Sequence, residues 1–183
     1  MNKNCISIIG FMGCGKTVVG KELSLLLGYK LIDLDDEIVK TINMPIKDFF
    51  SQFGEEQFRE IESLLLKQHL GLQNTIIACG GGIVLGEQNR HLLKSKSTVV
   101  WLHNPIKTSI NRIKDDSRPL LNVTNKTIRA STLLKKRIPL YKECSEIVKS
   151  TELLSPAMIA EQIIESLQNK KNTSKKNELT ITG

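Results

Sequence analysis

The feature that constrains this chain most is the segment GFMGCGKT, residues 10–17, which lies between a short apolar run and a helical pattern. It matches GxxxxGK[ST], with Gly10 and Gly15 at the glycine positions and Lys16 and Thr17 after them. A glycine-rich loop between a buried strand and a helix can wrap its N–H groups around phosphate oxygens, because glycine tolerates positive φ and carries no side chain. The start of the helix adds partial positive charge. The context therefore favours a phosphate-binding loop over an ordinary tight turn.

The two side chains that end the loop indicate a nucleoside triphosphate with its metal ion. Lys16 can reach the β and γ phosphates, and the Thr17 hydroxyl can contact Mg²⁺. Cys14 lies inside the loop, where it needs only to be small. A redox switch at this thiol is an alternative.

Apolar runs that alternate with helical patterns predict the fold class. Five runs read as strands: CISIIG, KLIDLD, NTIIACGGG, STVVWLH and SEIVKS. They are continuous rather than alternating, as is typical of strands covered on both faces. Helical patterns over residues 16–27, 55–70 and 155–167 separate or follow them. Repeated strand–helix–strand units predict an α/β fold, a three-layer αβα sandwich around a five-stranded parallel sheet.

Length and composition indicate one domain. The chain has 183 residues, of which 40% are hydrophobic, enough for one sizeable core. Its apolar runs are too short to span a bilayer, and its first residues lack the layout of a secretory signal. The four cysteines form no CxxC pair, so neither a zinc site nor a disulfide framework is indicated. We expect a cytoplasmic protein with no membrane partner.

The net charge of +7 could indicate a protein that binds nucleic acid, so the distribution of the charge along the chain matters. The segment 169–183 holds four lysines and one glutamate, a net of +3, in a polar and non-periodic stretch. Such a composition predicts a disordered basic tail. The remaining charge is spread along the chain, and aromatic residues make up only 4% of it. We therefore expect no nucleic-acid partner.

Two carboxylates at the end of the second predicted strand, in IDLDDEI, are candidates for chemistry. Asp33 and Asp35 are two apart, so on an extended chain they point the same way, at the edge of the sheet where such folds bind ligands. Phosphoryl transfer to an alcohol needs one anion near Mg²⁺ and benefits from another at the acceptor hydroxyl. We assign Asp33 to the metal, through water, and Asp35 to the hydroxyl. The alternative is an Asp cluster that only caps the following helix, and Asp36 fits that reading.

A second glycine run, Gly80, Gly81 and Gly82, follows the third predicted strand. Three glycines are poor strand residues, but they would let a small polyol approach the backbone closely. An ordinary loop is the alternative, although a loop rarely needs three. We expect this run to bind the acceptor.

Three arginines, Arg59, Arg118 and Arg137, have side chains suited to carboxylate or phosphate. Taken singly, each fits a solvated surface position better than a site. Arg118 lies in a polar stretch with weak periodicity, the kind of segment that closes over a reaction and excludes water. The case for these arginines depends on their lying together.

The ordered motifs GFMGCGKT, DLDDEI, FREIE, CGGGIV, RPLL and RIPLY closely resemble those of the shikimate kinases, and the resemblance covers Cys5 to about Leu167. It implies a P-loop NTPase fold of the nucleoside monophosphate kinase type with a mobile lid. It also implies transfer of the γ-phosphoryl group of ATP to the 3-hydroxyl of shikimate, on the route to chorismate and the aromatic amino acids. We expect a kinase domain over residues 1–168 with a lid at about 112–125, followed by the tail.

The resemblance also implies roles for individual residues. Arg59 and Arg137 would grip the shikimate carboxylate, while Asp35 and the backbone of the glycine run would hold the ring hydroxyls. Lys16 and Arg118 would neutralise the phosphoryl group in transfer, and Thr17 and Asp33 would organise Mg²⁺. Adenine would lie between Arg112 and the segment near Ser155 and Pro156. The predicted nucleotide-binding residues are Gly13, Cys14, Gly15, Lys16, Thr17, Val18, Arg112 and Arg118.

An adenylate kinase-like enzyme is disfavoured, because the acceptor side has too many carboxylate-binding arginines and no aromatic pocket for a base. Two other rival functions remain. A gluconate kinase shares the fold and the phosphate loop, but it is not expected to combine DLD, CGGG and RIPLY. A nucleotide-binding protein without catalysis, which uses its basic tail to bind nucleic acid or a partner, is the other. Intact Lys16, Thr17, Asp33, Asp35 and Arg118 argue against it. The resemblance favours a monomer that takes only small-molecule substrates.

Overall fold

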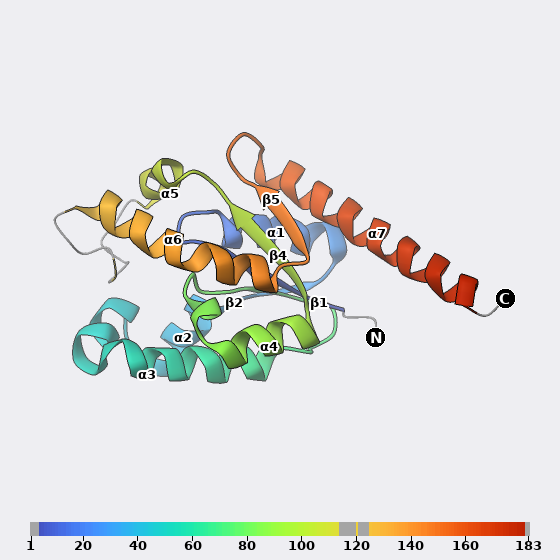
Figure 1. Ribbon diagram of the computed structural model, residues 1–183. Coiled ribbons are helices and arrows are strands. Elements are labelled where there is room, and N and C mark those ends of the chain that lie inside the picture. Colours follow the sequence, from blue (N-terminus) through green and yellow to red (C-terminus); the bar gives the residue numbers. More distant parts are fainter. Residues whose placement is uncertain (1–3, 114–119, 121–124, 182–183) are drawn as a thin grey trace.

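A five-stranded sheet forms the centre of the molecule (Figure 1). The structure is a computed structural model, and it describes residues 4–113, 120 and 125–181. The strands are β1 (Cys5–Ile9), β2 (Lys30–Asp33), β3 (Thr75–Ala78), β4 (Thr98–His103) and β5 (Ile147–Ser150). Their spatial order is β2-β3-β1-β4-β5, and every pair is parallel. All five predicted strands and the parallel sheet are confirmed.

Helices cover both faces of the sheet, as the continuous apolar runs predicted (Figure 1). On one face lie α1 (Lys16–Leu27) and α7 (Pro156–Ile181). On the other lie α2 (Leu34–Ile42), α3 (Ile46–His69), α4 (Glu87–Lys96) and α6 (Lys126–Cys144). A short 3₁₀ helix, η1 (Ile83–Leu85), precedes α4, and α5 (Ile106–Arg112) packs on α6. The predicted three-layer αβα sandwich is confirmed.

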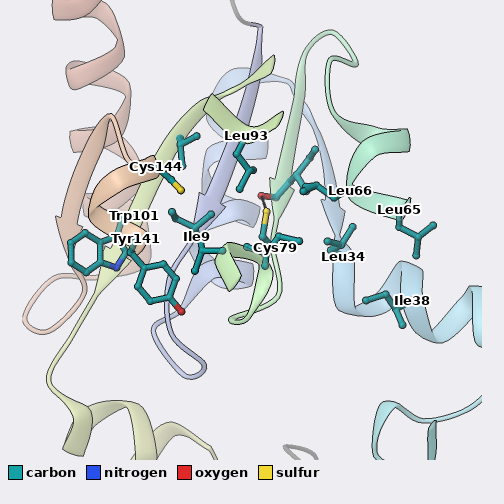
Figure 2. Packing of buried hydrophobic residues seen from close by; sticks show 14 of the residues in the cluster. Ile9, Leu34, Ile38, Leu65, Leu66, Cys79, Leu93, Trp101, Tyr141 and Cys144 are labelled. Carbon is teal, nitrogen blue, oxygen red and sulfur yellow. Dashed lines mark hydrogen bonds between the residues drawn. The ribbon is translucent and has the colours of Figure 1, made fainter. Parts of the chain in front are cut away.

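The central strand β1 shows why both faces need a cover. Successive side chains of a strand point to opposite faces. Ile9 therefore joins the core under α2, α3, α4 and α6, while Ile6 and Ile8 join the core under α1 and α7. The first of these cores, which includes Trp101, Tyr141, Leu34 and Cys79, is drawn in Figure 2.

One predicted helix boundary was confirmed and another was wrong. The helix predicted to begin near residue 55 is the second part of α3, whose axis changes direction at Gly54, where φ is 82°. Only glycine adopts that conformation without strain, so the kink lies there. The helix predicted to end at Leu167 continues to Ile181, and the tail expected to be disordered is helical over that range. Beyond Leu167 no proline or glycine interrupts the chain before Gly183, and Lys170 pairs with Glu146 at 3.0 Å.

No helix among the described residues is both long enough and apolar enough to cross a membrane.

Candidate functional site

The carboxyl ends of the parallel strands bring the candidate site residues to one edge of the sheet. The loop of residues 10–15 follows β1, Asp33 ends β2, the glycine run Gly80–Gly82 follows β3, and Thr151 follows β5. Parallel sheets place ligands at this edge because every connecting loop there can contribute. Segments that are far apart in the sequence therefore meet.

The phosphate loop is shaped before any ligand binds. Gly15 caps α1 with φ of 94°, in the left-handed region that favours glycine. A Cβ atom at Gly13 would overlap the backbone of Ser109 on α5. Lys16 curls back, and its Nζ donates to the carbonyl oxygens of Gly10 and Phe11, at 3.1 Å each. The Lys16 side chain therefore closes the loop by bonding to the loop's own carbonyl oxygens, and it places a positive charge at the amino end of α1.

Cys14 is a residue of this loop, and its side chain is fully buried. Burial raises the pKa of its thiol, although the nearby Lys16 offsets part of that effect. The thiolate is the reactive form of cysteine, so a buried thiol with a raised pKa is a poor redox switch. The reading that Cys14 serves as a small packing residue is the better one.

Thr151 ties the phosphate loop to the helix that ends at Arg112. Its hydroxyl donates to the carbonyl oxygen of Cys14 at 2.9 Å and accepts from Arg112 Nη1 at 3.3 Å. Arg112 Nη2 donates to the Thr151 carbonyl oxygen at 2.9 Å. Thr151 is buried, so these bonds are shielded from water. Sequence reasoning missed Thr151, because no motif marks a lone threonine.

Asp33 joins the phosphate loop to the next helix. Its Oδ2 accepts from the Thr17 hydroxyl at 2.6 Å, and its Oδ1 accepts from the backbone N–H of Asp35 at 3.0 Å. Asp33 is thus the N-cap of α2, which begins at Leu34. The expectation that Asp33 and Asp35 project the same way from an extended strand was wrong, because the chain turns into a helix between them. Capping falls to Asp33 rather than to Asp36.

The Thr17 and Asp33 oxygens fit a magnesium ion. Mg²⁺ prefers oxygen ligands and keeps several waters, so one hydroxyl and one nearby carboxylate, completed by phosphates, suffice. Among the described residues no group of three or more His, Cys, Asp or Glu side chains could hold a metal on its own. A metal at this point would therefore arrive with the triphosphate.

A pocket of about 450 Å³, counting the space open to solvent, lies beside the phosphate loop. Its charged lining comes from Asp35, Arg59, Glu62 and Arg137. The rest of the lining is apolar or glycine: Met12, Ile46, Phe50, Phe58, Gly80, Gly81, Gly82 and Leu120. The pocket combines two guanidinium groups and two carboxyl groups with an apolar wall.

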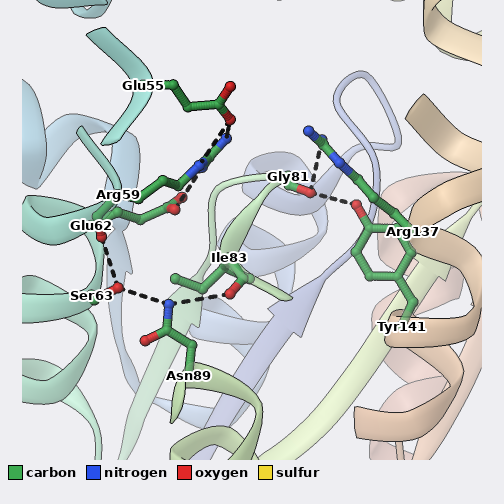
Figure 3. A network of polar contacts seen from close by, with 9 residues as sticks. All are labelled: Glu55, Arg59, Glu62, Ser63, Gly81, Ile83, Asn89, Arg137 and Tyr141. Carbon is green, nitrogen blue, oxygen red and sulfur yellow. Dashed lines mark hydrogen bonds and ion pairs between the residues drawn. The ribbon is translucent and has the colours of Figure 1, made fainter. Parts of the chain in front are cut away.

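Arg59 is held in the pocket wall by two carboxylates of its own helix (Figure 3). Nη1 lies 2.6 Å from Glu62 Oε2, and Nη2 lies 2.9 Å from Glu55 Oε1. Burial disfavours the charged guanidinium, but the two carboxylates outweigh it and raise the pKa of Arg59. Burial raises the pKa of Glu62, and Arg59 offsets part of that rise. Arg59 is therefore oriented and charged at neutral pH.

The glycine run packs closely against the side chains of Arg59 and Glu62. A Cβ atom at Gly82 would overlap the Arg59 guanidinium, and one at Gly80 would overlap Glu62 Oε1. A Cβ atom at Gly81 would lie 3.2 Å from the Met12 backbone nitrogen, which belongs to the phosphate loop. The run therefore bridges the pocket and the phosphate loop, and this close approach is why three glycines occur in succession.

Arg137 enters the pocket from the opposite wall, on α6. It is only 2% exposed, so the surface reading of this arginine was wrong. Its Nη1 donates to the Gly81 carbonyl oxygen at 3.2 Å, and its guanidinium lies over the Phe11 ring at 5.9 Å. Arg59 and Arg137 thus face one pocket together with Asp35, as the resemblance implied.

Some predicted residues are placed away from this pocket or cannot be located. Val18 lies in the first turn of α1 and is 48% exposed. Arg112 ends α5 and contacts Thr151, near the predicted adenine position. Arg118 and most of the lid predicted at about 112–125 lie outside the described residues. Sequence reasoning gave no role to Glu62, although it is part of the FREIE motif, nor to the apolar wall.

Comparison with known proteins gives consistent matches. The family model described as shikimate kinase matches residues 12–168. A shikimate kinase of Thermodesulfovibrio yellowstonii is 40% identical over 168 residues, which is 91% of this chain and 96% of that protein. The structure of a shikimate kinase from Acinetobacter baumannii in complex with shikimate has a TM-score of 0.90 and 33% identity, and covers 93% of this chain and 96% of that one. A gluconokinase structure from Sinorhizobium meliloti, with a TM-score of 0.60 and 14% identity over 95% of this chain and 97% of that one, shares the fold alone.

Proposed function

This chain belongs to the shikimate kinase family, and from that premise we propose how its site transfers a phosphoryl group from ATP to shikimate. The enzyme is an ATP-dependent kinase of the shikimate pathway with a P-loop NTPase fold. The observation that carries the proposal is the pocket that joins Asp35, Arg59 and Arg137 to the glycine run and Met12 of the phosphate loop. An anionic, hydroxylated ring fits that lining, because guanidinium groups pair with a carboxylate and a carboxylate accepts from hydroxyls.

Substrate binding follows from the charges of the two walls. Arg59 and Arg137 bind the shikimate carboxylate from opposite sides. Phe50 and Phe58 cover the apolar part of the ring. Asp35 accepts from a ring hydroxyl at the edge of the pocket near the phosphate loop. These contacts fix which hydroxyl faces the nucleotide, and orientation of this kind lowers the barrier of a two-substrate reaction.

The transfer step forms a bond between the 3-hydroxyl oxygen of shikimate and the γ-phosphorus, and breaks the bond between that phosphorus and the bridging oxygen of ADP. Asp35 takes the proton of the attacking hydroxyl. Lys16 leaves the carbonyl oxygens of Gly10 and Phe11 to contact the β and γ phosphates. Arg118 acts on the same phosphoryl group from the lid. The products are shikimate 3-phosphate and ADP.

Thr17 and Asp33 are the residues that would hold Mg²⁺, the hydroxyl directly and the carboxylate through water. Bound with ATP, the metal neutralises charge on the phosphates. The backbone of residues 13–18 surrounds the phosphates, and Arg112 covers adenine. Chelation of divalent cations should abolish ADP release, and added Mg²⁺ should restore it.

The experiment that tests the function is a coupled ADP-release assay with shikimate, gluconate and AMP offered separately. We expect turnover with shikimate alone. Turnover with gluconate in its place would favour the rival kinase. Salt-sensitive binding to DNA without ADP release would favour the non-catalytic rival.

Two further expectations belong to this proposal. We propose that the enzyme works as a monomer in the cytoplasm, which size-exclusion chromatography and cell fractionation would test.

A further inference from the structure

We propose that the Tyr141 hydroxyl is a positioning group for shikimate binding, because it holds the carbonyl of Gly81 and thereby sets the direction of the Gly81–Gly82 peptide unit in the pocket wall. This inference rests on the proposed function and assigns a role to a residue that does not line the pocket.

The contact is direct and shielded from water. Tyr141 Oη donates to the Gly81 carbonyl oxygen at 2.5 Å, and Tyr141 is fully buried on α6. Burial raises the pKa of this phenol, so the hydroxyl stays protonated and remains a donor. Arg137, four residues earlier on the same helix, donates to the same oxygen at 3.2 Å (Figure 3). One carbonyl therefore receives two donors from one wall of the pocket.

The second donor matters because Arg137 has another task. A guanidinium that binds the substrate carboxylate must direct its N–H groups to that anion. Tyr141 does not line the pocket, so the Gly81 carbonyl keeps this partner when Arg137 shifts toward the substrate. Among the described residues, the N–H of Gly82, which shares its peptide unit with the Gly81 carbonyl, donates to no backbone carbonyl oxygen. This N–H keeps one direction in the pocket wall only if the Gly81–Gly82 peptide unit stays in place.

Glycine makes this anchoring necessary. Three glycines in succession have wide conformational freedom, and their order must come from partners outside the run. A trans peptide is planar, so a carbonyl fixed on one side directs the following N–H to the other side. The far end of the run is fixed separately, since Asn89 Nδ2 donates to the Ile83 carbonyl oxygen at 3.2 Å and to Ser63 Oγ at 2.9 Å. Tyr141 supplies the matching restraint in the middle of the run.

The phenol ring can be kept while the hydroxyl is removed. Tyr141 stacks against Trp101, with ring centroids 5.8 Å apart and an interplanar angle of 23° (Figure 2). Phenylalanine preserves that stacking, so Tyr141→Phe keeps the ring and removes the hydroxyl, with its contacts to the Gly81 carbonyl oxygen and to Arg137. Trp101 is the only tryptophan of the chain, and its fluorescence reports whether the packing around residue 141 survives.

The test is steady-state kinetics of Tyr141→Phe with both substrates. Loss of one hydrogen bond of ordinary strength should raise the KM for shikimate about three- to tenfold. The KM for ATP should stay within about twofold, because the phosphate loop keeps its own contacts. Calorimetric titration with shikimate should show the same loss of affinity. Hydrogen exchange of the segment 79–85 should be faster in the variant without substrate, a readout independent of activity.

Ser97→Ala is the matched control. Ser97 also donates a buried hydroxyl hydrogen bond to a backbone carbonyl oxygen, that of Leu93, at 2.9 Å. It precedes β4 and so lies at the opposite edge of the sheet. A loss of general stability would affect both variants, whereas a positioning role affects shikimate binding only in Tyr141→Phe.

Three results would overturn the inference: an unchanged KM for shikimate in Tyr141→Phe, an equal rise of both KM values, or the same rise in Ser97→Ala. Unchanged exchange of the segment 79–85 would also contradict it. The proposed function fails in a different way, since the wild-type enzyme itself would then release no ADP with shikimate.

Discussion

The phosphate loop and the acceptor pocket lie side by side but are built in different ways. The loop is one segment, residues 10–17, whose shape comes from its own backbone and from Lys16 bonded to its carbonyl oxygens. The pocket is lined by described residues from six segments that are separate in the sequence, around positions 12, 35, 46–62, 80–82, 120 and 137. Arg59 is held there by Glu62, and Arg137 by the Gly81 carbonyl oxygen. A local motif therefore specifies the first region, whereas only the folded chain specifies the second.

This difference predicts that substitutions should separate the two substrates. A change in the pocket should alter shikimate kinetics and spare ATP, and a change beside the loop should do the reverse. The following predictions run from the largest expected effect to the smallest.

Asp35→Asn should reduce turnover about a hundredfold or more, because it removes the group that we propose accepts the proton of the hydroxyl. ATP affinity, measured by calorimetric titration, should stay close to that of the wild type. Asp36→Asn, one residue later on α2, is the control and should retain turnover. Near-normal turnover of Asp35→Asn would remove Asp35 from the catalytic set.

Arg137→Ala should raise the KM for shikimate by about ten- to a hundredfold, since a charged hydrogen-bonding partner of the substrate is lost. The KM for ATP should not follow. Arg129→Ala, an exposed arginine of the same helix, is the matched control and should behave like the wild type. An equal loss for both substrates would mean that the two regions are not separate.

Thr151→Val tests the region of the loop. Valine keeps the shape but removes the hydroxyl that joins Cys14 to Arg112, so the KM for ATP should rise about three- to tenfold while the KM for shikimate stays unchanged. Thr75→Val is the matched control, because Thr75 is also buried and its hydroxyl bonds the Gln73 carbonyl oxygen at the opposite edge of the sheet. A shift of the shikimate KM in Thr151→Val would contradict the assignment.

Deletion of residues 169–183 should have the smallest effect. Among the side chains that the structure describes, the apolar contacts of α7 with the core extend to Leu167. The ion pair of Lys170 with Glu146 is largely exposed and is worth about 1 kcal/mol or less. We expect both KM values and turnover to be unchanged and the melting temperature to fall only slightly. A large loss of activity would show that the end of the chain serves the site.

The sequence predicted the loop well because the motif and its context are contiguous. It predicted the strands equally well, since apolar runs of that length have few other solutions in an α/β chain. The direction in which the Asp35 side chain points could not be predicted from an extended strand. The helix α2 begins at Leu34, directly after β2, and the Asp33 carboxylate caps it by accepting from the Asp35 N–H. Whether Asp33 or Asp36 caps the helix depends on that same bond.

The surroundings of the arginines could not be derived from local pattern. Arg137 contacts Gly81, 56 residues away, and Tyr141 contacts it across 60 residues. Pro139 lies inside α6, where proline normally interrupts a helix, so the segment does not read as a buried helix face. The resemblance to the family predicted the roles of Arg137 and the glycine run. Only the structure identified Glu62 as the partner of Arg59 and Tyr141 as the partner of Gly81.

The bond pattern of Asp33 carries a consequence for the thermodynamics of the enzyme. One oxygen of this carboxylate holds Thr17 of the nucleotide region, and the other holds the backbone of Asp35 at the acceptor. This side chain therefore connects the nucleotide region to the acceptor region by two hydrogen bonds. Nucleotide binding that draws this side chain toward the phosphates would change the affinity for shikimate. Because coupling between two binding sites is reciprocal, shikimate would then change the affinity for the nucleotide by the same factor.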